Sequence, residues 1–343
     1  MQSRRRREEE EDGRQWKPVL PWLPPRDLAS VSATCRSLRR LSAAVTARRA
    51  ADASRGLESL PIPFRTPSPA SSPPYASFLY TPFPVVGSPS PPGAFSHPWG
   101  GRRPDEPSPA PPSAFAVLAA YAGHGGCDCE EEADGCCHPA ANCPCGFLAA
   151  EVATECGPAC RCGPPRCRNR RTQGGTSVAV EIVWSERKGW GLHAAEAIQK
   201  GRFVCEYAGE FLTTAEARRR QRGYDEAASG GGGGGGGRVS AALLVLREHL
   251  PSGRACLRVN IDATAVGNAA RFINHSCDGG NLGGVLVRNS GLLLPRLCFF
   301  ASRDIQVGEE LTFSYGEAEG QHTGRPCFCG SPDCRGFLPS EET

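Results

Sequence analysis

Short apolar runs with strand character fill the second half of the chain. They are rich in β-branched and aromatic residues and bounded by turn residues, and they predict strands at residues 178–184, 203–207, 243–246, 257–261, 284–288 and 297–301. Between the second and third runs, Thr213 and Glu216 have capping-box spacing and predict a helix through residues 218–220. Many short strands and few helices predict a mainly β fold.

A helical pattern occupies the N-terminal segment, residues 16–57. Apolar residues recur at three- and four-residue steps between Asp27 and Arg49, which predicts one helix capped by Asp27. The apolar stripe consists of Leu28, Val31, Cys35, Leu38, Leu41 and Val45. The sequence from Leu23 to Leu38 resembles part of an F-box, the helical module that docks ubiquitin-ligase adaptors. Two interpretations stay open: an adaptor-binding helix or a small helical appendage.

Two segments have compositions that oppose regular structure. Residues 58–113 are rich in proline and serine, with 17 of the 31 prolines between Pro61 and Pro112, and they predict a disordered linker. Residues 230–237 are consecutive glycines, which predict a flexible insertion within the β region.

The charged N-terminus, the lack of long apolar runs and the small net charge argue against a secreted protein, a membrane protein and a sequence-specific nucleic-acid binder. Residues 1–15 hold Arg4–Arg7 followed by an acidic run, which is typical of a disordered tail or of a nuclear address. There is neither an apolar signal-peptide core nor a run approaching the roughly 20 apolar residues of a membrane span, so we expect a reducing compartment and no membrane. The net charge of +3 gives no global signal for nucleic acid, and we expect no sequence-specific binding to it.

Cysteines gather in two arrays on either side of the apolar region. Ten lie between Cys127 and Cys167 with almost no hydrophobic residues among them, so this stretch cannot fold by burial alone. Thiolates at such spacings favour zinc, whose binding supplies folding free energy. Three more cysteines lie close to the C-terminus. Three thiolates are one fewer than a tetrahedral zinc site needs.

Three motifs lie between these arrays or join them: Lys188–Gly191, Arg271–Cys277 and Glu310–Gly316. With the cysteine arrays, they resemble the SET-domain protein lysine methyltransferases, specifically the plant suppressor-of-variegation-related histone methyltransferases. The resemblance runs from Cys127 to about Phe337. It implies folded β ribbons with a pseudoknot, built from three modules: a pre-SET zinc cluster at 120–175, a SET catalytic domain at 176–316 and a post-SET segment at 325–343.

The resemblance also implies the zinc ligands. In this family nine pre-SET cysteines share three zinc ions, so one of Cys136 and Cys137 is surplus, and we assign Cys137 as the ligand. Cys277 leaves the catalytic motif and completes the post-SET site, which holds a fourth ion. The implied ligands are Cys127, Cys129, Cys137, Cys143, Cys145, Cys156, Cys160, Cys162, Cys167, Cys277, Cys327, Cys329 and Cys334.

Site residues follow from the same resemblance. Those implied to bind S-adenosylmethionine are Lys188, Gly189, Trp190, Arg271, Asn274, His275 and Tyr315. Tyr315 matches the catalytic tyrosine, and Tyr207 is implied to line the lysine channel with it. Phe313 occupies a position where the family has Phe or Tyr, and Phe leaves room for two or three methyl groups. Ala242 replaces a tyrosine common in the family, which puts cofactor affinity and substrate preference in doubt.

The implied function is a nuclear, chromosomal histone-lysine methyltransferase that acts in gene silencing. Lysine 9 of histone H3, in the tail or the nucleosome, is the expected target. Two alternatives stay open: a methyltransferase of a non-histone protein, and a catalytically weak scaffold for chromatin or ubiquitin-ligase components.

Overall fold

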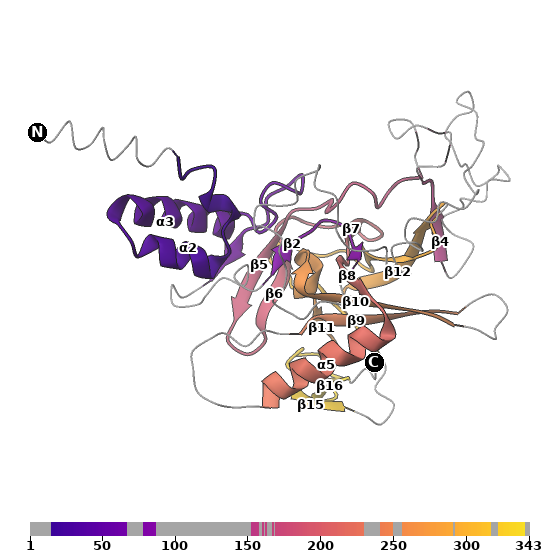
Figure 1. Cartoon of the computed structure of the whole chain (residues 1–343). Coiled ribbons are helices and arrows are strands. Elements are labelled where there is room, and N and C mark those ends of the chain that lie inside the picture. Colours follow the sequence, from indigo (N-terminus) through magenta and orange to yellow (C-terminus); the bar gives the residue numbers. More distant parts are fainter. Residues whose placement is uncertain are drawn as a thin grey trace, which may run out of the picture.

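Strands dominate the molecule. The computed structural model describes residues 15–66, 78–86, 152–157, 160, 162, 167, 169–229, 241–249, 256–290, 292–316 and 322–339. Within these ranges the strands form five small sheets, and the longer helices are a hairpin near the N-terminus and one helix beside the sheets (Figure 1). The mainly β fold is therefore confirmed. None of the helices in the described ranges is long and apolar enough to span a membrane.

Three sheets enclose the main hydrophobic core. The first is ordered β1 (Phe64–Arg65), β5 (Val180–Ser185), β6 (Gly189–Ala194). The second is ordered β2 (Leu79–Tyr80), β10 (Cys256–Gly267), β8 (Gly209–Leu212), β3 (Val85–Val86), with β9 (Leu243–His249) also paired to β10. The third is ordered β4 (Val152–Glu155), β12 (Leu282–Asn289), β13 (Arg296–Ala301), β7 (Phe203–Glu206). All six predicted strands are present.

Two smaller pairs and two helical elements complete this body. The pairs are β11 (Asn274–His275) with β14 (Thr312–Phe313), and β15 (His322–Pro326) with β16 (Phe337–Pro339). The short helix η3 (Ala269–Phe272) precedes β11. Helix α5 (Thr214–Ser229) begins where the capping box predicted, because the Thr213 hydroxyl accepts a hydrogen bond from the Glu216 amide at 3.3 Å.

A partly buried arginine joins β4 to the rest of its sheet. Arg296 on β13 contacts Glu206 of β7 at 2.7 Å and Glu155 of β4 at 3.2 Å. Burial raises the pKa of Glu206 to about 7, and Arg296 opposes this shift. Since Glu155 ends the strand that leads into the cysteine-rich segment, this network anchors that segment to the catalytic sheets.

The N-terminal segment forms a helical hairpin, so the prediction of one helix capped by Asp27 is wrong. After η1 (Leu20–Trp22), α2 (Pro25–Ser32) begins with proline at its first position, and α3 (Arg36–Ala51) begins after an extended Cys35 whose sulfur accepts a hydrogen bond from the Leu38 amide. The stripe continues in register across the turn, which is why the pattern resembles one helix.

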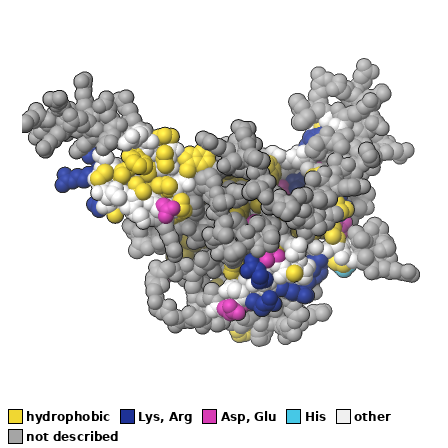
Figure 2. Space-filling model, in the orientation of Figure 1, with side chains coloured by type: hydrophobic (Ala, Val, Ile, Leu, Met, Phe, Trp, Pro, Cys, Tyr) yellow, Lys and Arg dark blue, Asp and Glu magenta, His cyan; other side chains and the backbone are white. Residues whose placement is uncertain are grey.

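Folding into a hairpin turns the apolar stripe inward. Leu28 and Val45 pack with Leu20 in a small core of their own, and Val31, Leu38 and Leu41 pack against it. Figure 2 shows other hydrophobic side chains over this region, where the exposed residues include Trp16, Val19 and Trp22. Adaptor binding by this segment remains a prediction. The apolar stripe would not provide the binding surface, because most of it packs inside the hairpin.

Two stretches of the expected linker belong to the catalytic body, so the prediction of a disordered linker is wrong for residues 61–66 and 78–86. Strand β1 pairs with β5, β2 with β10 and β3 with β8, all in parallel. Ile62, Phe78 and Tyr80 are almost fully buried in the main core. Averaged composition hides such isolated apolar residues among prolines, because only the partner strands give them a place to pack.

Other predicted segments lie outside the described residues. These are the charged tail to residue 14, the remaining linker at 67–77 and 87–113, the glycine run, and the cysteines from Cys127 to Cys145.

Truncating Phe78 tests the structural role of the linker. Phe78→Ala should lower the free energy of unfolding by about 3 to 5 kcal/mol, because it removes a ring that is 2% exposed and packed on Phe272. Phe83→Ala is the matched control, since Phe83 lies in the same stretch and is 47% exposed. Denaturant unfolding measures both. If both variants lose an equally small amount of unfolding free energy, this stretch acts only as a linker.

Candidate active site

The centre of the site is a short parallel pair between β11 and β14. Asn274 aligns with Thr312 and His275 with Phe313, and the Ser276 amide donates to the Phe313 carbonyl at 3.0 Å. Two motifs separated by almost forty residues thus become neighbours. This is the strand pairing expected where the chain threads as a pseudoknot, and it places four predicted site residues, Asn274, His275, Phe313 and Tyr315, on two adjacent segments.

His275 connects this pair to the next turn of chain. Its Nδ1 accepts a hydrogen bond from the Tyr315 amide at 3.1 Å, so the neutral ring carries its proton on Nε2. That Nε2 faces the Cys277 sulfur at 3.3 Å. Burial, aided by the charge of Arg335, lowers the pKa of His275, which favours the neutral ring.

Tyr315 lies in an aromatic cluster with a fixed hydroxyl. Its ring centroid is 5.0 Å from that of Phe313, which lies 4.7 Å from Phe299. The hydroxyl donates to the Ile273 carbonyl at 2.8 Å. Burial raises the pKa of Tyr315 above its ordinary value, and the charge of Glu310 adds to the rise. The phenol is therefore neutral at physiological pH and acts as a hydrogen-bond donor to the backbone.

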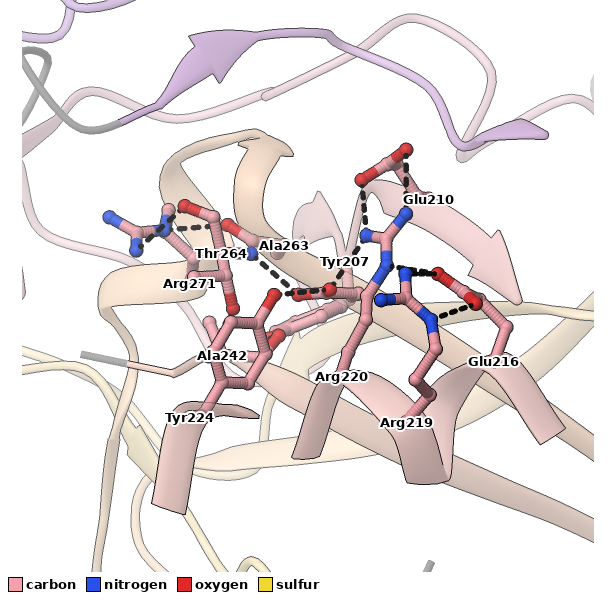
Figure 3. Close-up of polar contacts among 11 residues, drawn as sticks. Tyr207, Glu210, Glu216, Arg219, Arg220, Tyr224, Ala242, Ala263, Thr264 and Arg271 are labelled. Atoms are coloured by element: carbon pink, nitrogen blue, oxygen red, sulfur yellow. Dashed lines mark hydrogen bonds and ion pairs between the residues drawn. The ribbon is translucent and has the colours of Figure 1, made fainter. Parts of the chain in front are cut away.

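Tyr207 has the same arrangement. It follows β7, is 6% exposed, and donates its hydroxyl proton to the Ala242 carbonyl at 3.0 Å (Figure 3). In both phenols the proton is engaged by a backbone carbonyl, so each oxygen keeps lone pairs that can accept a hydrogen bond from another group.

The motif around Trp190 joins Asn274 through an acidic residue. Glu310 contacts Lys188 Nζ at 2.6 Å and accepts a hydrogen bond from Asn274 Nδ2 at 2.9 Å. The same Asn274 nitrogen lies 3.3 Å from the Trp190 carbonyl oxygen. A Cβ atom at Gly191 would lie 2.8 Å from a Glu310 carboxylate oxygen, so a larger residue there would displace Glu310 from this arrangement. Lys188, Trp190 and Asn274 are thereby brought together as the sequence predicted.

Neighbouring glycine and aromatic residues set the orientation of the indole. Gly189 has φ of +78°, a left-handed conformation that favours glycine. The Trp190 ring packs edge-on against Trp184 at 5.2 Å and Phe64 at 5.5 Å. Phe64 comes from the segment expected to be a linker.

Arg271 packs instead against the protein itself. Its Nε donates to the Ala263 carbonyl at 2.8 Å, and its guanidinium lies over the rings of Phe78 and Phe272. Burial lowers the pKa of Arg271 to about 10. These contacts anchor the segment that precedes β11, and its predicted contact with cofactor remains a prediction.

Four thiols gather beside the paired strands β11 and β14, which we call the threaded pair. Cys277, Cys327, Cys329 and Cys334 have sulfur atoms within 4.8 Å of one another, and the first two sulfurs are 3.8 Å apart. A tetrahedral zinc ion with Zn–S bonds of about 2.3 Å places its sulfurs about 3.8 Å apart, so the cluster fits zinc. The predicted fourth ligand from the catalytic motif is therefore in place.

A second thiol cluster lies where β4 leads into the cysteine-rich segment. Cys156, Cys162 and Cys167 are buried with sulfurs within 4.8 Å of one another, and this also fits metal binding. The buried Cys160 sulfur accepts a hydrogen bond from the Gly157 amide at 3.3 Å. The other predicted ligands of this array, from Cys127 to Cys145, lie outside the described residues.

A hollow separates the threaded pair from the C-terminal segment. His275, Ser314 and Gly316 line one side, and Arg335 and Phe337 line the other. The four-thiol cluster therefore fixes the C-terminal segment beside the residues predicted to bind cofactor.

Two supporting residues were missed from sequence. The motif Glu310–Gly316 predicts no role for Glu310 itself, and Phe64 falls in the stretch expected to be a linker. A charged residue next to a hydrophobic strand was the available signal for Glu310. Nothing local identified Phe64, because its partners are more than a hundred residues away.

Comparisons with known proteins agree with this geometry. A family model for the SET domain matches residues 189–316. The chain is 49% identical to the histone-lysine N-methyltransferase SUVR3 of Arabidopsis thaliana over 336 residues, which are 95% of this chain and 90% of that protein. It is 36% identical to the H3 lysine-9 specific SUVH1 of Nicotiana tabacum over 54% of this chain and 25% of that protein.

Solved structures are similar over most of the chain. Arabidopsis thaliana SUVH6 in complex with SAM has a TM-score of 0.58 and 28% identity, covering 84% of this chain and 55% of that one. KRYPTONITE with mCHH DNA, H3(1–15) peptide and SAH has a TM-score of 0.57 and 27% identity, covering 84% and 53%.

The resemblance to SUVR3 covers nearly the whole chain, including the threaded pair and the four-thiol cluster. The chain therefore belongs to the SET-domain histone-lysine N-methyltransferases, which use S-adenosylmethionine as methyl donor.

Proposed function

We propose that this enzyme methylates lysine 9 of histone H3 in chromatin of the nucleus. The observation that carries the proposal is the threaded pair and the two hydrogen bonds that hold Tyr315 beside it. The Tyr315 amide donates to His275, and the Tyr315 hydroxyl donates to the Ile273 carbonyl. The choice of lysine rests on two similar proteins: SUVH1 is described as specific for H3 lysine 9, and KRYPTONITE was solved with an H3(1–15) peptide.

The chain's own residues orient the lysine amine. S-adenosylmethionine, when bound, supplies a methyl group on a sulfonium, and displacement requires the amine lone pair to point at that carbon. The hydroxyl protons of Tyr207 and Tyr315 are engaged by backbone carbonyls, so their oxygens can accept hydrogen bonds from the amine N–H groups. Accepting those bonds leaves the nitrogen lone pair directed away from both phenols, towards the methyl group.

Cofactor and metal binding follow the same assignment. Lys188, Gly189, Trp190, Asn274 and His275 would hold the cofactor beside the hollow. One zinc ion would join Cys277 to the C-terminal thiols, and three would be held by the cysteine-rich segment, of which Cys156, Cys160, Cys162 and Cys167 are described. The first ion would fix the C-terminal segment over the site and exclude water.

Mass spectrometry of histone tail peptides tests the target lysine. Zinc-loaded enzyme with S-adenosylmethionine should methylate an H3 tail peptide at lysine 9 only, and Tyr315→Phe should lower the rate roughly a hundredfold, because it removes one orienting oxygen. Replacing lysine 9 of the peptide with arginine is the substrate control. Methylation at another lysine would contradict the target, and an active Tyr315→Phe enzyme would contradict the role of Tyr315.

Phe313 is expected to set the number of methyl groups. This ring is 9% exposed and packs between Phe299 and Tyr315, so the wild-type enzyme should make di- and trimethyl-lysine. In Phe313→Tyr the added hydroxyl should hold a water molecule where further methyl groups would lie, biasing the product to monomethyl-lysine. Product distributions by mass spectrometry measure this, with Phe300→Tyr on β13 as a matched control. Identical distributions would remove Phe313 from product control.

Cys277 should be required for one zinc ion. Cys277→Ser should reduce bound zinc by one ion per chain and lower affinity for S-adenosylmethionine, because the C-terminal segment loses its link to the threaded pair. Elemental analysis and calorimetric titration measure the two effects. Cys256→Ser, at an exposed cysteine outside both clusters, should change neither. An unchanged zinc content in Cys277→Ser would contradict the four-thiol site.

A further inference from the structure

The Tyr207 hydroxyl is held by the backbone of Ala242, whose carbonyl and amide groups are both hydrogen-bonded to β10. The Ala242 carbonyl accepts hydrogen bonds from the Tyr207 hydroxyl at 3.0 Å and from the Ala263 amide at 2.9 Å. The Ala242 amide donates to the Thr264 hydroxyl oxygen at 2.9 Å. Consecutive residues of β10 therefore fix the carbonyl that determines where the Tyr207 proton points (Figure 3).

The stretch of β10 that bonds Ala242 directly follows the pairing with β9, which ends at Asp262 and Leu243, while its pairing with β8 is interrupted. Opposite β8, the register shifts between Asp262 and Gly267, so the residues between them are not aligned with β8 partners. The Ala263 and Thr264 groups turn instead towards Ala242 and towards Arg271, whose Nε donates to the Ala263 carbonyl at 2.8 Å. One irregular stretch of β10 thus contacts both Ala242, which bonds Tyr207, and the segment that leads into β11.

Asp262 connects this stretch of β10 to helix α5. One carboxylate oxygen accepts from the Thr264 amide at 2.9 Å, while the other accepts from Arg220 and from the Tyr224 hydroxyl, both at 2.8 Å. Asp262 is completely buried and Arg220 is 2% exposed. Buried charges persist only when they are paired and hydrogen-bonded, so the positions of these groups are mutually fixed.

Helix α5 is in turn held by further carboxylates on the same arginine. Arg220 contacts Glu210 of β8 at 2.6 Å and Glu216, one helical turn earlier, at 2.9 Å. An unbroken series of contacts therefore runs from α5 through Asp262, Thr264 and Ala242 to the Tyr207 hydroxyl. It uses the backbone of residue 242, which explains how an alanine suffices at that position.

We propose that Thr264, supported by Asp262 and Tyr224, is a positioning residue for Tyr207. By accepting a hydrogen bond from the Ala242 amide, Thr264 fixes the backbone of Ala242. The Tyr207 proton then stays on the Ala242 carbonyl, and the lone pairs of the Tyr207 oxygen stay available to the lysine amine. Without the Thr264 hydrogen bond, the phenol can rotate its proton towards the amine and lose its function as an acceptor. The inference rests on the role proposed above for Tyr207.

A double-mutant cycle tests the relay. Thr264→Val keeps the shape but removes the acceptor for the Ala242 amide, and it should lower kcat on recombinant histone H3 roughly threefold to tenfold without changing KM for S-adenosylmethionine. Tyr207→Phe should lower kcat at least as much. In the Tyr207→Phe background, Thr264→Val should cause no further loss, because both changes remove the same interaction. Methyl incorporation at any lysine is counted, so the result does not depend on the target lysine.

Matched variants separate positioning from stability. Thr264→Ser keeps the hydroxyl and should restore kcat. Thr176→Val is the control, because Thr176 is equally buried and its hydroxyl has no hydrogen-bond partner in the structure. If Thr264→Val does not fold, Tyr224→Phe replaces it in the cycle, since it removes the hydroxyl that bonds Asp262 and Thr264 from a half-buried position on α5.

Each remaining outcome overturns part of the account. Equal losses from Thr264→Val in both backgrounds, or a Thr264→Ser enzyme as slow as Thr264→Val, would overturn the relay and leave Tyr207 in its role. Unchanged kcat and product distribution in Tyr207→Phe would overturn the role of Tyr207 and the relay with it.

Discussion

The two-residue pairing of β11 with β14 is the constraint on which the site depends. It is too short to be stable alone, so it is held by what surrounds it: the Ser276 amide on Phe313, the Tyr315 amide on His275 and the Tyr315 hydroxyl on Ile273. Because Cys277 follows directly, the thiol cluster lies at the same point. The thiol cluster, the residues proposed to bind cofactor and the proposed catalytic phenol are therefore parts of one local structure.

Buried charges extend this rigidity outward. Arg220 joins α5 to β8 and β10 near Tyr207, while Arg296 joins β4 to β7 and β13. Each arginine contacts more than one carboxylate, an arrangement that is costly to desolvate but strongly directional once formed. Helix α5 and the cysteine-rich segment are thus fixed to the catalytic sheets by geometry, and the aromatic residues at the centre keep defined positions.

Sequence predicted the features whose signal is local. The six strands and the α5 capping box depend on local spacing, whereas the thiol that completes the C-terminal cluster was implied by the family resemblance. The single N-terminal helix was wrong because the apolar period continues through the turn at Cys35. Phe64 and Phe78 were assigned to a linker because their burial depends on distant strands. Thr264 carried no signal, and Glu310 carried only that of a charged residue next to a hydrophobic strand, since their roles arise only when distant segments meet.

Hydrogen exchange with and without cofactor tests the central claim that β11 and β14 act as one unit of the site. Binding of S-adenosylmethionine to the zinc-loaded enzyme should slow exchange in the peptides containing residues 274–276 and 313–315 together and by similar factors, because the Ser276 and Tyr315 amides are bonded across the pair. Slowing in one peptide while the other is unchanged would contradict the account.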